Sequence, residues 1–289
     1  MSYVSLWGFV MLLQRAAYLG VIVFFLSFII SSFFFSCTQV AKTNNFKVNR
    51  FHMNEYGDES SFPNKNFIFL EKYLTVDDNN ETCYKKPSEC TGLGPMIASA
   101  SGAVFKKSGD TAYILTAGHF CSDEGEGIEK VDGKHAVRAY AAYVQNFHLP
   151  VRILKVDLEN DLCLISAKDP DIRRMNFKRL KVRKSKPKIG ERIYTISAPL
   201  GIYSPFSRHH FAGNYSGCED YFKTRQIFCF YTIPAAEGSS GSIVLDKDGK
   251  VVGMIQLALI GFNNISMGIH QDQIRLFLND AAEELNIIF

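Results

Sequence analysis

The 289-residue sequence lacks several features that would assign it to common functional classes. It has no Cys-x-x-Cys pair, the spacing typical of structural zinc sites and thioredoxin-like centres, and we predict no metal or cofactor. Its formal net charge is only +3, so we expect no nucleic-acid partner. It also lacks the composition of a disordered chain, because 47% of its residues are apolar and 21% are charged. These values indicate a globular protein with one large domain or two modest ones.

The seven cysteines fall into two groups. Cys37 closes a hydrophobic N-terminal segment, and the other six lie in the part expected to fold: Cys83, Cys90, Cys121, Cys163, Cys218 and Cys229. Six cysteines suit up to three disulfides if this part lies outside a reducing cytosol. Buried free thiols are the alternative. Cys83 and Cys90 bracket six residues and could close a small loop.

Residues 16–36 contain no charge over 21 positions, which is long enough to cross a bilayer as a helix. We therefore predict a hydrophobic N-terminal helix within 1–37, either a retained transmembrane anchor or a cleaved signal peptide. A start at Met11 gives a short basic region before the apolar core, and Ser36 before Cys37 loosely resembles a lipoprotein cleavage site. A buried core helix is the remaining alternative. The main interpretations predict an exported or membrane-anchored protein, on the periplasmic or extracellular side of the cell envelope.

The chain after residue 96 reads as short strands separated by polar turns, which predicts an all-β fold of two antiparallel barrels. The expected strands are 101–105, 111–116, 136–147, 150–157, 161–166, 192–198, 211–213, 225–233, 242–246, 251–259 and 266–270. Residues 67–74 are left open between a strand and a short helix. Apolar spacing over 271–285 predicts a C-terminal amphipathic helix.

These elements predict five parts after residue 37: an irregular extension over 38–95, a first barrel over 96–172, a basic linker over 173–190, a second barrel over 191–270 and a C-terminal helix over 271–289. The stretch 173–192 holds ten Lys or Arg residues and one Glu. We interpret it as a solvated linker, with contact to an acidic partner or anionic lipid as the alternative.

Three short motifs occur in the order His119, Asp161, Ser240. His119 ends the run ILTAGH, Asp161 begins DLCLI, and Ser240 lies in the pentapeptide GSSGS at 238–242. Alone, each has a plain structural interpretation, since Gly and Ser make turns and a single His or Asp is commonly structural. Together they have the chain order of His-Asp-Ser proteases. Asp157 and Glu159 are alternatives for the acid, and Ser239 is an alternative nucleophile, although only Ser240 has Gly two before and one after it.

These motifs resemble those of the trypsin/chymotrypsin-like serine peptidases, in particular the simple bacterial and viral branch that includes the periplasmic heat-shock proteases. Residues 190–201 resemble the entry to that family's second barrel, and 251–255 resemble the strand that binds substrate backbone. The resemblance covers 101–278. It implies a serine endopeptidase that forms an acyl-enzyme, with protein or peptide substrates and membrane association only through the N-terminal segment. It leaves the oligomeric state open.

The resemblance also assigns roles. Ser240 is the expected nucleophile, His119 its base, and Asp161 the partner that orients and stabilises the imidazole. The N–H groups of Gly238 and Ser240 are the expected oxyanion hole. Because Ser239 stands where many digestive members have Asp, we do not expect activation by a cut N-terminus.

The resemblance bears on disulfides and specificity as well. It makes the pairing of Cys218 with Cys229 plausible and that of Cys121 with Cys163 conceivable. The residues expected to line the primary pocket, 234–236, carry no charge, so we expect a small or apolar side chain rather than Lys or Arg. A non-catalytic binding module and a self-processing or polyprotein-processing protease are the alternative functions.

Overall fold

The structure is a computed structural model that describes residues 62–76, 93–122, 130–131, 134–204, 208–220, 227–259, 261–262 and 264–289. The predicted N-terminal helix, the cleavage site at Cys37 and the loop between Cys83 and Cys90 lie outside these residues. None of the helices in the described part of the chain combines the length and apolar character needed to cross a bilayer.

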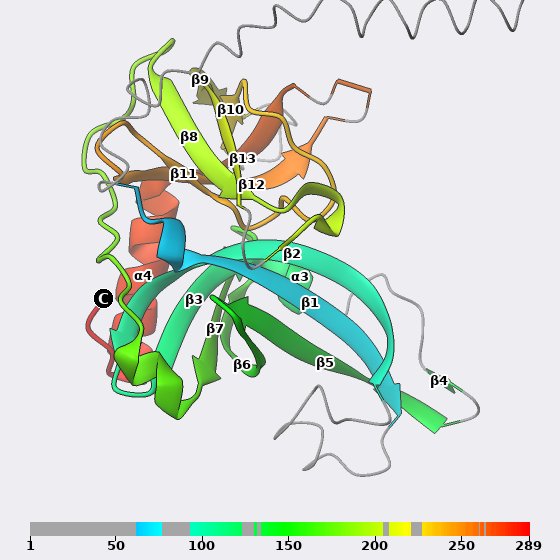
Figure 1. Ribbon diagram of the computed structural model, residues 1–289. Helices are drawn as coiled ribbons and strands as arrows, with labels where there is room; N and C mark the ends of the chain where they lie inside the picture. Colours follow the sequence, from blue (N-terminus) through cyan, green and yellow to red (C-terminus); the bar gives the residue numbers. More distant parts are fainter. Residues whose placement is uncertain are drawn as a thin grey trace, which may run out of the picture. The chain divides into compact units, whose positions relative to one another are not determined.

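Six strands close the first barrel in the order β1-β2-β3-β7-β6-β5, because β1 pairs with β5 as well as with β2 (Figure 1). The bounds are β1 Phe67–Val76, β2 Leu93–Ser108, β3 Thr111–Ala117, β5 Lys134–Val144, β6 Phe147–Asp157 and β7 Leu162–Lys168, with the short β4 Lys130–Val131 paired to β5. A 3-10 turn, η2 (Asn64–Asn66), precedes β1, and another, η4 (Pro170–Arg174), follows β7.

Both faces of β3 contribute buried residues, which explains the run of adjacent apolar residues at 112–115. Ala112 and Ile114 belong to the core inside the first barrel, whereas Leu115 and Ala117 belong to a second core cluster. That second cluster also contains Tyr194 and other residues of the second barrel. Successive strand residues point to opposite faces, so β3 contributes to both cores and brings its last residues to the boundary between the barrels.

The second barrel is closed by six strands in the order β10-β13-β12-β11-β8-β9. Their bounds are β8 Arg192–Ser197, β9 His209–Glu219, β10 Phe228–Tyr231, β11 Ile243–Leu245, β12 Val251–Ala258 and β13 Ser266–His270. A 3-10 turn, η5 (Pro199–Gly201), follows β8. Two antiparallel barrels with a C-terminal helix confirm that part of the predicted fold.

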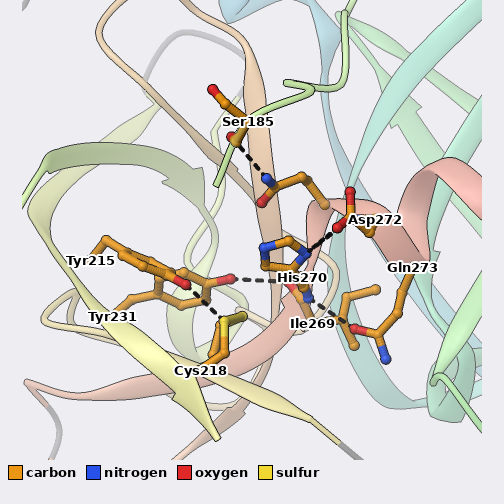
Figure 2. Close-up of a disulfide and its surroundings, with 10 residues drawn as sticks. Ser185, Tyr215, Cys218, Tyr231, Ile269, His270, Asp272 and Gln273 are labelled. Atoms are coloured by element: carbon orange, nitrogen blue, oxygen red, sulfur yellow. Dashed lines mark hydrogen bonds and ion pairs between the residues drawn. A yellow bond between two sulfur atoms is a disulfide. The ribbon is translucent and has the colours of Figure 1, made fainter. Parts of the chain in front are cut away.

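Tyr231 is the largest fully buried side chain among the described residues, and its hydroxyl donates a hydrogen bond to the Ile269 carbonyl at 3.0 Å (Figure 2). Burial raises the pKa of this hydroxyl. A Cβ on Gly253 would lie 2.0 Å from the same oxygen, so the glycine leaves space for the tyrosine. A disulfide joins Cys218 to Cys229 across the paired strands β9 and β10, as the resemblance implied.

The C-terminal helix α4 spans Gln271–Leu285, the predicted range, and starts directly after β13. Its apolar residues, including Ile274, Phe277 and Leu278, pack into the core cluster shared by the barrels. The helix begins with a capping box: His270 Nδ1 accepts from the Asp272 N–H, and the Gln273 side chain accepts from the His270 N–H (Figure 2). The start of α4 is therefore fixed to the end of β13.

Two segments differ from the sequence-based expectation in an informative way. Residues 67–74, left open and placed within the irregular range 38–95, form β1 and complete the first barrel. The basic stretch after η4 is largely irregular, yet it is held in place: Val182 bridges Val251 of β12, and Arg183 pairs with Glu191. It therefore runs along the second barrel as a fixed connection.

Candidate active site

His119 and Asp161 face each other at the ends of two paired strands. β3 ends at Ala117 opposite Leu162, the first residue of β7. His119 lies in α3 (Gly118–Cys121), a single helical turn that follows β3. Its Nδ1 lies 2.9 Å and 3.0 Å from the two oxygens of the Asp161 carboxylate, and its backbone N–H donates to the same carboxylate at 2.6 Å. The side chain of His119 is 51% exposed and that of Asp161 18%, so the imidazole is accessible while its partner is largely covered.

Gly118 permits this close approach. A Cβ at this position would lie 2.8 Å from the Leu162 nitrogen and 2.9 Å from the Asp161 carbonyl carbon. Any side chain would therefore push α3 away from β7. The disulfide Cys121–Cys163 ties the same two elements together, two residues beyond each of the paired side chains. The small size of Gly118 and the disulfide both keep His119 close to Asp161.

Asp161 itself has a left-handed backbone, with φ at 52°. This conformation costs a non-glycine residue about 1–2 kcal/mol. It therefore needs support from its surroundings, and residues placed this way cluster at functional sites. The rival acids take other roles or positions: Asp157 accepts hydrogen bonds from Asn160 N and Nδ2, and Glu159 is exposed.

Ser240 lies in the turn between β10 and β11, and this turn is docked on the first barrel. The Ser240 carbonyl accepts from the Ser101 N–H of β2 at 2.8 Å. Gly241 has φ at +86°, and a Cβ there would lie 2.1 Å from the Ser101 carbonyl oxygen and 2.4 Å from Thr116 Oγ1. Only glycine fits this contact, so the pentapeptide motif reflects the packing of the two barrels.

The two serines of the pentapeptide differ in environment. Ser239 is 1% exposed, and its Oγ accepts from the Ala236 N–H at 3.2 Å. Ser240 is partly exposed, and its Oγ donates to the Gln256 carbonyl at 3.0 Å. No hydrogen bond joins Ser240 to His119 among the described residues. Ser239 therefore closes the turn, whereas Ser240 is free to turn its hydroxyl toward solvent or substrate.

The backbone before Ser240 presents two N–H groups. Among the described residues, no hydrogen-bond acceptor is found for the N–H of Gly238 or of Ser240. The Glu237 carbonyl accepts from the Leu200 N–H at 2.5 Å, and Ser101 Oγ donates to the Gly238 carbonyl at 2.8 Å. In a trans peptide the C=O and N–H point in opposite directions. Holding the Glu237 carbonyl on Leu200 therefore directs the Gly238 N–H the other way.

A cavity of about 450 Å³ opens beside His119 and Asp161. Its other lining residues are Ser122, Leu158, Phe228, Gln256 and Leu257, so its walls are largely apolar. The sequence analysis did not single out these residues, because isolated positions in strands and turns, apolar or polar, carry no signal of their own. Nor did it single out Asn160, which holds the Asp161 turn. No group of three or more His, Cys, Asp or Glu side chains in the described residues could hold a metal ion.

Comparison with known proteins matches this chain to one family. The model of the trypsin-like peptidase domain matches residues 100–254, more than half of the chain. A protein named serine protease HtrA-like from Staphylococcus aureus (strain USA300) is 26% identical over 194 residues, which cover 62% of this chain and 23% of that protein. Its namesake from Staphylococcus epidermidis is 28% identical over 170 residues, covering 55% and 26%. This chain thus matches about a quarter of the length of these relatives.

The solved structures include a similar fold. The crystal structure of the serine endoprotease from Yersinia pestis superposes with a TM-score of 0.51 and 15% sequence identity. The match covers 76% of this chain and 63% of that chain. At this identity the likeness concerns the fold alone.

Proposed function

The chain belongs to the trypsin-like peptidase domain family, and on that basis we propose that it is a serine endopeptidase with Ser240, His119 and Asp161 as its triad. The observation that carries the proposal is the contact of His119 Nδ1 with both Asp161 oxygens, at 2.9 and 3.0 Å, beside an accessible cavity. This contact fixes the tautomer in which Nδ1 carries the proton and Nε2 is left to accept one.

The reaction begins with a change in the direction of the Ser240 hydroxyl. In the structure Ser240 Oγ donates to the Gln256 carbonyl. Rotation of the Ser240 side chain about Cα–Cβ breaks the hydrogen bond to Gln256 and turns the hydroxyl toward His119 Nε2. The imidazole takes the proton as Oγ attacks the substrate carbonyl carbon, and Asp161 stabilises the imidazolium that forms. His119 then gives the proton to the amine as the C–N bond breaks, which leaves the acyl group on Ser240. His119 next takes a proton from water as the water oxygen attacks the acyl carbon, and it returns this proton to Ser240 Oγ as the ester bond breaks.

The N–H groups of Gly238 and Ser240 are proposed to bind the oxyanion that develops during the attack. Their free donors and the bond from Leu200 to the Glu237 carbonyl support this role. Backbone donors of this kind are already in place before the reaction and need not move during it. Each typically contributes about 3 kcal/mol of transition-state stabilisation.

Substrate preference is proposed to be for small or apolar side chains. Ala235 is buried and, like Pro234 and Ala236, uncharged, while Glu237 is exposed at the rim. The cavity beside His119 adds the apolar walls described above. A basic substrate side chain would find no buried acid among these residues.

The compartment is proposed to be outside the cytosol. The disulfides Cys121–Cys163 and Cys218–Cys229 fit an oxidising environment. Attachment through residues 16–36 remains a prediction from the sequence.

A fluorophosphonate probe and a peptide library test the activity together. We expect the wild-type protein to be labelled and to cleave after small or apolar residues. Ser240→Ala should lose both activities, because the attacking oxygen is gone. The matched control is Ser239→Ala, which removes a neighbouring hydroxyl that only closes the turn and should keep labelling.

Each alternative gives a distinct result. Equal labelling of Ser240→Ala and wild type would refute the assignment of the nucleophile. A folded wild-type protein that neither hydrolyses peptides nor reacts with the probe would be a binding module. A mature N-terminus that is cut in the wild type and intact in Ser240→Ala would indicate self-processing.

A further inference from the structure

Gln256 makes polar contacts with two parts of the candidate active site. It lies on β12 of the second barrel and is 2% exposed. Its side-chain Nε2 donates to the carbonyl oxygens of Asn160 at 2.8 Å and Asp161 at 3.0 Å. Its own backbone carbonyl accepts the hydroxyl of Ser240. One buried residue of the second barrel thus contacts the nucleophile and the turn that carries the acid.

The orientation of the Gln256 amide follows from its partners. Both Asn160 and Asp161 present carbonyl oxygens, which only accept hydrogen bonds, so the NH₂ end must face them and both of its hydrogens are used. The other end, Oε1, is buried and has no hydrogen-bond partner in the described ranges of the chain. A buried acceptor without a partner is unfavourable. The chain therefore keeps a polar residue here although the amide is only half satisfied.

The backbone that Gln256 contacts is the one that needs support. Asp161 is the non-glycine residue with φ at 52° at the end of the turn between β6 and β7. In this conformation its carboxylate reaches His119. If the turn relaxed toward an ordinary backbone angle, the carboxylate would point elsewhere.

The neighbouring residue is held just as firmly. Asn160 Oδ1 accepts from Gln273 Nε2 of α4 at 3.1 Å, and Asn160 N and Nδ2 donate to the Asp157 carboxylate at 3.0 and 2.8 Å. The start of α4 and the turn itself therefore fix the side chain of Asn160. Within the part of the chain that the structure describes, Gln256 is the one residue whose side chain donates to the two carbonyls that flank the left-handed bend.

We propose that Gln256 is a positioning residue for the triad: its side-chain amide holds the 160–161 backbone in the conformation that aims Asp161 at His119. This inference rests on the proposed peptidase function. It also explains how the barrels are matched. His119 and Asp161 belong to the first barrel and Ser240 to the second, and Gln256 connects the acid's turn to the nucleophile across that boundary.

The test compares Gln256→Met with a matched control, Gln271→Met. Methionine keeps the length of the side chain and removes the two donors, while the backbone carbonyl that meets Ser240 stays. Gln271 is also fully buried and donates one hydrogen bond to the Ser185 carbonyl at 2.9 Å. Among the described residues its Oε1 has no hydrogen-bond partner, and its side chain makes no hydrogen bond to His119, Asp161 or Ser240. The two variants should lose similar stability in urea unfolding.

Their kinetics should differ. We expect Gln256→Met to lower kcat by about 10–100-fold with little change in KM, by analogy with the loss that is typical when the hydrogen-bond partner of a metal-ligating side chain is removed. We expect Gln271→Met to keep kcat within about twofold of wild type. Gln256→Glu should be the less active of the two Gln256 variants at neutral pH, because it sets a carboxylate oxygen against two carbonyl oxygens.

A double-mutant cycle separates positioning from general loosening of the structure. If Gln256 acts through Asp161, the kcat loss of Gln256→Met should largely vanish in an Asp161→Asn background. Equal kcat losses for the Gln256 and Gln271 variants, or full additivity with Asp161→Asn, would overturn the positioning role. An inactive wild-type protein would refute the peptidase function instead. That result would be seen before any Gln256 variant is made.

Discussion

Removing the disulfide Cys121–Cys163 should affect stability and activity together. The perturbation is the double variant Cys121→Ala/Cys163→Ala, and the matched control is Cys218→Ala/Cys229→Ala in the second barrel. Cys163 and Cys229 are both fully buried, so the loss of their sulfur atoms should cost similar amounts and largely cancel in the comparison. What differs is the length of chain that each disulfide closes.

The magnitudes follow from the chain entropy of the unfolded state. The first disulfide spans 42 residues and the second 11. Loop closure then gives about 4 kcal/mol for the first and about 3 kcal/mol for the second. Both are large fractions of the 5–15 kcal/mol that typically stabilises a domain. We therefore expect the unfolding free energy of the first variant to be about 1 kcal/mol lower than that of the control. The first variant should accordingly unfold at a lower urea concentration.

The activity difference should be larger than the stability difference. Without the first disulfide, the four-residue turn α3 loses a covalent link to β7 and His119 can drift from Asp161. We expect the rate of fluorophosphonate labelling to fall roughly tenfold or more, because a displacement of about 1 Å at reacting groups is costly. The control should keep its labelling rate within about twofold.

The assay is urea unfolding followed by circular dichroism, with labelling rates measured in buffer where both variants are folded. Equal stability losses would contradict the loop-entropy argument. A greater loss of labelling in the control than in the first variant would refute the structural one.

Two further predictions concern the oxyanion donors and pH. Gly238→Ala should reduce kcat at least about 100-fold and lower stability, since φ of Gly238 is +85° and a Cβ would lie 2.4 Å from the Ala198 carbonyl oxygen. Peptide hydrolysis measures the first effect and thermal unfolding the second. A near-normal kcat would contradict the proposed oxyanion hole. Burial, assisted by Lys186 and Arg275, lowers the pKa of His270 and outweighs the opposing effect of Asp272. The unfolded chain then binds this proton more readily, so stability is complete above about pH 6.5 and falls as the pH drops toward the folded pKa. His270→Asn keeps an N-cap acceptor without a titrating ring, and its Tm should fall less than that of wild type over this range; parallel Tm curves would refute the argument.

The sequence predicted most of the second half of the chain because its signals are local. The strand 266–270 and the helix 271–285 match the structure at both ends. Strand alternation, turn residues and helical apolar spacing act over a few residues, so they can be read without the fold. The order of His119, Asp161 and Ser240 was also visible, since each lies in a short motif at the end of a strand or in a glycine-flanked turn.

β1 shows why other parts could not be predicted. Ile68 and Leu70 pack inside the first barrel, while Phe67 and Phe69 pack against Ile196 in a separate cluster with residues of the second barrel. With both faces buried, the strand shows no alternation of polar and apolar residues, and its sequence fits a helix as well. Only the presence of a second barrel on its outer face decides the matter.

The sequence by itself predicted which side chains are the proposed acid, base and nucleophile, and in what order they occur. The tertiary structure decided how they meet. Asp161 reaches His119 because Gly118 and the Cys121–Cys163 disulfide hold the turn α3 close to the start of β7. Gln256 reads as an isolated polar residue in an apolar strand, because its partners lie 95 and 96 positions away in the chain. Contacts at such separation depend on the packing of the two barrels, which no local pattern encodes.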